Sequence, residues 1–229
     1  SNIFNIGKKK KVNVGIASGR YCYSVWLRHL VLAHENNLNI NPKTIAELGP
    51  GSSIGVGLAA LLSGANKYYA FDVIKYASLE KNLVVFDELI ALFEKREAIP
   101  DNHEFPNLKP MLNDFKFPKD ILTNERLTNS LKKDRIQGIR DALKNFSNGS
   151  SFISYKVPWF NPSIIKKNSL DLIFSQATLE HVEDLQNTYA AMNLWLKKDG
   201  FISHQIDFKS HGISYEWNGH WTYEDLTWR

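Results

Sequence analysis

The stretch TIAELGPGSSIGVGLAALLSGANKYYAFDV (44–73) limits most strongly what this chain can fold into. A short apolar run leads into Gly49-Pro50-Gly51, where glycine lets the backbone approach a ligand closely. The next apolar run (54–62) predicts a helix, and the aromatic run 67–73 predicts a second strand. Asp72 stands at the end of that strand, where a carboxylate can bind both hydroxyls of a ribose. This order predicts a mononucleotide half-site, which a dehydrogenase, a methyltransferase or a phosphate-binding enzyme can use.

The rest of the chain alternates predicted helices and strands. The predicted helices are 21–36, 54–62, 78–93, 132–146 and 185–196, and the predicted strands are 44–48, 67–73, 151–157, 169–176 and 201–208. This order predicts an α/β fold of Rossmann-like type, with a mostly parallel sheet and helices on both faces. We expect a single domain over residues 1–229. Residues 75–150 are too long for one crossover, so a helical insertion is expected after the second strand.

Composition limits the class of protein. Hydrophobic residues make up 43% of the chain and charged residues 23%, which is ordinary globular composition. No apolar run approaches the roughly 20 residues that span a bilayer, so we expect no membrane span. Cys22 is the single cysteine, which excludes an internal disulfide and favours a cytoplasmic protein. The net charge of +4 resides partly in Lys8–Lys11, but no nucleic-acid motif accompanies that run, so no nucleic-acid partner is expected.

The residue that separates the possible ligands is Glu47, which precedes the glycines in the sequence E-L-G-P-G. A loop that grips a pyrophosphate gains nothing from a carboxylate, whereas a cationic ligand gains attraction or oriented donors. S-adenosylmethionine carries a sulfonium and an ammonium group. No G-x-x-x-x-G-K-[ST] sequence is present, which excludes a P-loop. The half-site is therefore expected to bind S-adenosylmethionine.

Four segments resemble, in order and spacing, the motifs of the class I S-adenosylmethionine-dependent methyltransferases. They are AELGPGSSIG, YYAFDV, NSLDLIFSQATLEHVEDL and WLKKDGFISHQID. The third is the most specific, because dehydrogenases have no equivalent of DLIFSQATLEHV after their fourth strand. The fourth departs from the family's L-K-P-G-G turn at Lys198 and Asp199, while Gly200 supplies the flexible residue. More narrowly, the chain resembles methyltransferase-domain proteins of bacterial surface-polysaccharide synthesis.

The resemblance implies methyl transfer from S-adenosyl-L-methionine to a hydroxyl of a sugar or of another small polar acceptor. The implied cofactor contacts are Glu47, Gly49 and Gly51 at the methionine part, Asp72 at the ribose, Val73 at the adenine, and Gln176 with Ala177 at the reactive methyl. Lys156-Val157 stands where the family commonly has Asp-Ala, so only a backbone contact is expected there. Sheets of this family usually end with two further strands, so we expect that C-terminal strands are missing from this chain.

A hydroxyl acceptor benefits from a general base, for which the ordinary pKa of histidine is suitable. The candidates are His181, just past the fourth predicted strand, and a couple of His211 with Asp207 near the end of the fifth. Structural roles stay open for all three. No metal-ligand signature such as H-E-x-x-H is present, so no metal is expected. The aromatic segment 214–228 either stacks on a sugar ring or covers the sheet edge.

Two alternative functions remain. A nicotinamide-dependent oxidoreductase can use a similar half-site, but Glu47 and the segment SQATLEHV argue against it. A non-catalytic domain can keep the fold as an assembly scaffold, although the intact Glu47, Gly49, Gly51 and Asp72 argue against that function. The sequence leaves the acceptor and the oligomeric state open.

Overall fold

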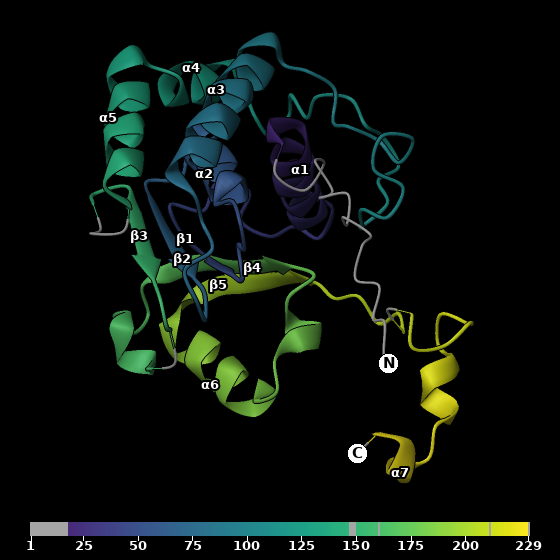
Figure 1. Cartoon of the computed structure of the whole chain (residues 1–229). Helices are drawn as coiled ribbons and strands as arrows, with labels where there is room; N and C mark the ends of the chain where they lie inside the picture. Colours follow the sequence, from purple (N-terminus) through teal and green to yellow (C-terminus); the bar gives the residue numbers. More distant parts are fainter. Residues whose placement is uncertain (1–17, 147–149, 160, 211, 229) are drawn as a thin grey trace, which may run out of the picture.

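The computed structural model of this 229-residue chain describes residues 18–146, 150–159, 161–210 and 212–228. Its centre is a five-stranded sheet of order β3-β2-β1-β4-β5, in which all neighbouring strands are parallel (Figure 1). The strands are β1 Thr44–Leu48, β2 Lys67–Phe71, β3 Ile153–Lys156, β4 Leu170–Gln176 and β5 Leu196–Gln205. This is the doubly wound order, which confirms the predicted Rossmann-like α/β fold. The order reverses between β1 and β4, and ligands of such sheets bind at the carboxyl ends of the strands beside that point.

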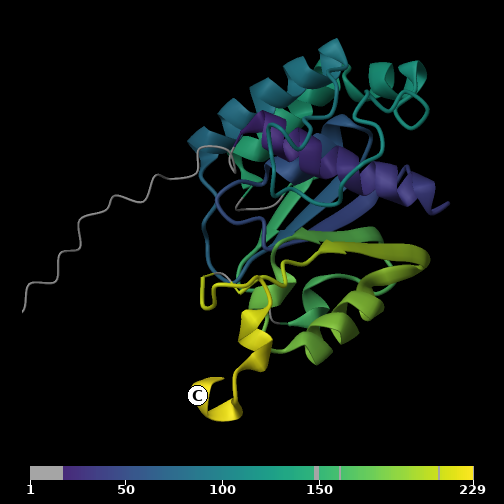
Figure 2. The same cartoon turned by 90° about the vertical axis from the view of Figure 1, so that its right-hand side faces the viewer.

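Helices cover both faces of the sheet (Figures 1 and 2). α1 (Gly19–Glu35), α2 (Gly55–Leu62) and α3 (Leu79–Lys95) pack on one face, and α6 (Leu185–Trp195) packs on the other. Alternate residues of β1 enter one core or the other, because successive side chains of a strand point to opposite faces. Two hydrophobic cores therefore hold the sheet, one on each side.

The expected helical insertion follows β2. The chain between β2 and β3 contains α3, α4 (Asn124–Ser130) and α5 (Lys133–Lys144), and α3 packs against α5. α4 has no counterpart among the predicted elements, because its sequence NERLTNS has a single large apolar residue. The irregular segment between α3 and α4 reaches α1, where the rings of Tyr21 and Phe105 meet edge-on with centroids 5.6 Å apart. The insertion thus contacts the amino-terminal helix as well as α3.

The amino end of α2 is satisfied by α3. All eight residues of α2 are buried, so its end groups must find partners inside the protein. The side-chain oxygen of Asn82, in α3, accepts the Ile54 N–H at 3.0 Å and the Ser53 hydroxyl at 2.8 Å. The Asn82 side chain therefore fixes the point at which the glycine loop becomes a helix.

The carboxyl end of α2 is satisfied by the insertion. Arg126, in α4, donates to the Ser63 carbonyl at 2.7 Å, and Arg135, in α5, donates to the Leu61 carbonyl at 3.0 Å. Cations near the carboxyl end of a helix stabilise it through the helix dipole. α2 has no basic residue of its own in its last turn. The insertion therefore supplies hydrogen-bond donors that the buried helix α2 needs, and it is part of the core structure.

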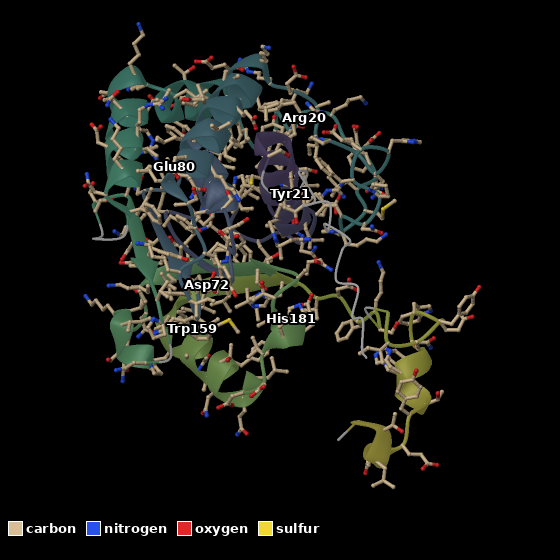
Figure 3. The ribbon with its side chains drawn as sticks, viewed as in Figure 1. Arg20, Tyr21, Asp72, Glu80, Trp159 and His181 are labelled. Carbon is tan, nitrogen blue, oxygen red and sulfur yellow. The ribbon has the colours of Figure 1, made fainter. Side chains whose placement is uncertain are left out.

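α1 begins earlier than predicted. Its first residue is Gly19, and the side chain of Ser18 accepts the Tyr21 N–H at 3.2 Å as an amino-terminal cap. Arg20, which precedes the predicted helix, consequently lies in the first turn of α1 together with Tyr21 (Figure 3). Their side chains are thereby fixed by helical geometry.

β5 also begins earlier than predicted, and it runs along one edge of the sheet. The residues KKDG continue the strand through a shift of register instead of forming a turn. The strand ends at Gln205, so Asp207 lies beyond it. The following segment, which contains η5 (Gly219–Thr222) and α7 (Asp225–Trp228), leads away from the body of the protein (Figures 1 and 2). In the described part of the chain, no strand pairs with the outer edge of β5.

The sequence predicts neither a membrane span nor a nucleic-acid partner. In the described ranges, no helix has both the length and the apolar character needed to cross a bilayer. The basic run Lys8–Lys11 lies outside the described residues.

Arg28 anchors the insertion to α1 from inside the core. Its side chain is fully buried, and its guanidinium donates to the carbonyl of Pro100 at 3.2 Å and to that of Pro110. Arg20, on the same helix, instead forms a partly exposed ion pair with Glu104, with an N···O distance of 2.6 Å. The two arginines differ in burial and in the kind of partner.

We expect Arg28→Ala to lower the free energy of unfolding by about 2–4 kcal/mol, because it leaves buried carbonyl groups without donors. Arg20→Ala should cost less than about 1 kcal/mol, since exposed ion pairs contribute little. Urea denaturation of both variants, followed by circular dichroism, measures the two losses. Equal losses would contradict the anchoring role of Arg28.

Candidate functional site

The loop after β1 depends on two glycines with left-handed backbone angles. Gly49 has a φ of 65° and Gly51 a φ of 67°, a region that residues with a Cβ rarely adopt. A Cβ at Gly49 would lie 2.4 Å from the methyl carbon of Thr178, so the loop approaches the segment after β4 closely. A Cβ at Gly51 would meet no described atom within 4 Å. A ligand therefore has room to approach the backbone at Gly51.

Asp72 closes this loop from the end of β2 (Figure 3). The residue is 5% exposed, and its carboxylate accepts the N–H of Gly51 at 3.2 Å and that of Val73 at 2.8 Å. The structure thus brings together two residues that the sequence predicts for one half-site. A carboxylate has about four lone-pair positions, and these bonds use two of them. The remaining positions can accept hydroxyl groups of a ligand.

Glu47 is turned into the core beneath α2. The residue is 3% exposed, and its carboxyl group accepts the Tyr68 hydroxyl at 2.6 Å and the Gly57 N–H. Burial raises the pKa of this carboxyl group to about 8, although the two hydrogen bonds lower it, and the nearby Asp72 raises it further. Glu47 therefore links β1, β2 and α2. Its direct contact with a ligand stays a prediction.

Apolar and aromatic groups border the loop. Burial, together with Cys22 and Glu47, raises the pKa of Tyr21 to about 12, so its phenol stays protonated at neutral pH. Val73, predicted to lie beside an adenine, is 49% exposed, and Tyr76 is 55% exposed. Tyr76 has no predicted role, because one aromatic residue on a loop carries no specific pattern. Half-exposed apolar groups at the end of β2 offer a surface for a planar ring.

The segment after β4 lies against the glycine loop. Ala177 has a φ of 50°, a strained angle for a residue with a Cβ, and its N–H donates to the Gln205 carbonyl at 2.9 Å. Gln176, predicted to face the reactive methyl, donates its side-chain amide to the Gln205 side chain at 2.9 Å and is thereby held against β5. The contact of Thr178 with Gly49 has no signal in the sequence, because it joins segments that are far apart along the chain.

The candidate general bases lie in two segments. His181 is exposed at the end of the short helix η4 (Leu179–His181), which follows β4 at the carboxyl edge of the sheet (Figure 3). Asp207 follows β5, and its carboxylate accepts the Lys209 N–H at 3.1 Å. A surface cavity of about 580 Å³ is lined by Asp207, Lys209, Ser210, Gly212, Ser214, Tyr215 and Trp217. His211 lies outside the described residues, so the couple of His211 with Asp207 stays a prediction.

His29, in α1, and His204, in β5, pack against the sheet. Nδ1 of His29 lies 2.7 Å from the Ser203 hydroxyl, and Nδ1 of His204 lies 2.8 Å from the Ser175 hydroxyl. Burial lowers the pKa of each to about 4, and the charge of His204 lowers that of His29 further. Both rings are neutral at neutral pH. Within the described ranges, no group of three or more His, Cys, Asp or Glu residues is placed to hold a metal ion.

Comparison with known proteins yields a likeness to solved structures. No family model matches the chain, and no curated protein matches it. The similar structures include selenomethionine-labelled phosphoethanolamine N-methyltransferase 1 of Haemonchus contortus in complex with phosphoethanolamine and S-adenosylhomocysteine, with 13% sequence identity and a TM-score of 0.36. The match covers 85% of this chain and 28% of that chain. A likeness this low carries no residue role across.

Glu47 should make the stability depend on pH. Its pKa rises from an ordinary 4.5 to about 8 on folding, so the folded protein holds the proton more tightly. This contribution to stability is complete below about pH 4.5 and is lost as the pH rises through about 8. We expect the free energy of unfolding of Glu47→Gln, relative to the unsubstituted protein, to increase by roughly 1 kcal/mol or more between about pH 5 and pH 8.5. Thermal unfolding at a series of pH values measures this difference.

His29 and His204 act in the opposite direction. Their lowered pKa values favour the folded state above about pH 6.5, and that contribution is lost as the pH falls toward 4. Both histidines are present in the two proteins, so their contribution cancels in the difference. A difference that stays constant over the pH series would show that Glu47 is not a protonated buried group.

Proposed function

We propose that this chain is an S-adenosylmethionine-dependent methyltransferase whose cofactor binds at the carboxyl edge of the sheet, over the ends of β4, β1 and β2. The observation that carries the proposal is the hydrogen bond from the Gly51 N–H to Asp72. It places a carboxylate with free acceptor positions beside a glycine loop that is open on its ligand side. Those positions match the two neighbouring hydroxyls of a ribose. Val73, half exposed beside Asp72, offers an apolar surface to the adenine.

Glu47 favours a cationic cofactor over a dinucleotide. A positive charge near a buried carboxyl group stabilises its ionised form, whereas the pyrophosphate of NAD would oppose ionisation. The raised pKa of Glu47 shows that ionisation is costly in the free protein. A cation at the loop therefore gains more from this residue than an anion can. An NAD-dependent oxidoreductase is the less favoured function.

The bound cofactor supplies a methyl group that is already activated on a sulfonium. The residues of the chain then need to hold an acceptor in line with it and to take a proton from the acceptor hydroxyl. We assign the removal of this proton to His181, with the couple of His211 and Asp207 as the alternative base. The exposed rings of Tyr215 and Trp217 beside Asp207 support a sugar hydroxyl as the acceptor, and so does the resemblance of the chain to methyltransferase-domain proteins of surface-polysaccharide synthesis. The single cysteine supports a cytoplasmic location.

Calorimetric titration with S-adenosylhomocysteine, with NAD in parallel, tests the cofactor. We expect micromolar binding of the first alone and a loss of at least about tenfold in Asp72→Ala, because hydrogen bonds to a charged group contribute about 1.5–3 kcal/mol each. Asp120→Ala removes an exposed carboxylate of the insertion and should bind as the unsubstituted protein does. If the unsubstituted protein binds neither ligand, both the methyltransferase and the oxidoreductase function are excluded. A scaffold domain then remains as the candidate function.

His181→Ala tests the assigned base once an acceptor is found by screening nucleotide sugars with radiolabelled S-adenosylmethionine. We expect kcat to fall about 100-fold or more while S-adenosylhomocysteine binding stays the same, because the side chain acts on the acceptor proton. His34→Ala, at an exposed position of α1, is the control. An unchanged kcat in His181→Ala would move the role to Asp207 and His211.

A further inference from the structure

Glu180 carries a buried carboxyl group without a partner. Both of its side-chain oxygens are buried, and neither has a hydrogen-bond partner in the described part of the chain. The other two buried carboxyl groups near the glycine loop are satisfied. Glu47 accepts bonds from Tyr68 and Gly57, and Asp72 accepts two backbone N–H groups. Glu180 differs from both.

An arrangement of this kind is costly in the free protein. Buried polar groups in native structures are almost always hydrogen-bonded, and a buried polar group left without a partner costs free energy. Each such group in a native structure therefore calls for an explanation, and a role in binding or catalysis is one of the known explanations. In the free protein, no donor of a described residue lies within hydrogen-bond distance of the Glu180 carboxyl oxygens.

The position of Glu180 ties it to the candidate site. It lies in η4, between Thr178, which contacts the glycine loop at Gly49, and His181, which lies at the carboxyl edge of the sheet (Figure 3). The strained backbone of Ala177 sets the direction of this segment as it leaves β4. The unpartnered carboxyl group therefore belongs to the segment that borders the reversal point between β1 and β4.

We propose that Glu180 receives an ammonium group of a bound ligand. An ammonium offers three donors and a positive charge, which match two unpartnered carboxylate oxygens in both hydrogen bonding and charge. Two ligands can bring this group: the amino acid end of the cofactor, or an amine of the acceptor such as that of an amino sugar. The inference rests on the proposed function, because it concerns the same site and refines what binds there.

The first arm of the test concerns the cofactor. Glu180→Gln keeps the shape of the side chain and removes its charge, and Glu183→Gln makes the same change at a nearby exposed position. Both variants are titrated with S-adenosylhomocysteine and with 5′-methylthioadenosine, which lacks the ammonium and the carboxylate of the amino acid. If the cofactor supplies the ammonium, Glu180→Gln binds S-adenosylhomocysteine at least about tenfold more weakly and 5′-methylthioadenosine equally well, while Glu183→Gln is unchanged.

The second arm concerns the acceptor. Thermal unfolding in saturating S-adenosylhomocysteine is measured with millimolar glucosamine, N-acetylglucosamine or glucose. Only the first of these sugars carries an ammonium. If the acceptor supplies it, glucosamine alone raises the Tm of the unsubstituted protein and of Glu183→Gln, and it fails to do so in Glu180→Gln.

The Tm without ligands separates a binding role from a structural one. Because Glu180 has no hydrogen-bond partner to lose in the described part of the chain, the Tm of Glu180→Gln should equal or exceed that of the unsubstituted protein. A lower Tm would show that Glu180 has a structural partner and would overturn the inference, as would ligand responses that are identical in the two variants. If the unsubstituted protein binds neither adenosine compound, the proposed function fails. The Tm comparison, and the glucosamine series repeated without cofactor, then still decide the role of Glu180.

Discussion

The half-site depends on a short helix that is almost completely shielded from water. Every residue of α2 is buried, so its end groups must be satisfied by protein. Asn82 satisfies the amino end, while Arg126 and Arg135 satisfy the carboxyl end. The approach of α2 to the sheet is equally strict, because a Cβ on Gly57 would lie 2.1 Å from the ring of Tyr68. The glycine loop leads directly into α2, so these contacts also determine where a ligand can meet the loop.

The strands and their order follow from patterns that are plain in the sequence. β1, β2 and β4 are short apolar or aromatic runs that end at glycine or polar residues, so their predicted ends differ little from the observed ones. α4 escapes prediction because its sequence is mostly polar and Leu127 is buried only through tertiary packing. The start of β5 is predicted wrongly because KKDG has the composition of a turn, whereas pairing with β4 extends the strand through it.

For the site, the sequence predicts positions along the chain better than side-chain surroundings. Asp72 was expected at the glycine loop and is found there, bonded to Gly51. Alternation along β1 does not reveal that the Tyr68 hydroxyl holds the Glu47 carboxyl group under α2. Thr178 could be recognised only from the fold, because it meets a loop 129 residues away. Contacts between distant segments leave no local pattern in a single sequence.

The two arginines that cap α2 also constrain the order in which the chain can fold. They follow the carbonyl groups that they bind by 63 and 74 residues. During synthesis, β1, α2 and β2 leave the ribosome well before these donors do. We expect the early segments to stay without a stable core during that interval, with apolar surface open to chaperones. The glycine loop and Asp72, which precede the insertion in the sequence, would then reach their final arrangement only after the insertion has been synthesised.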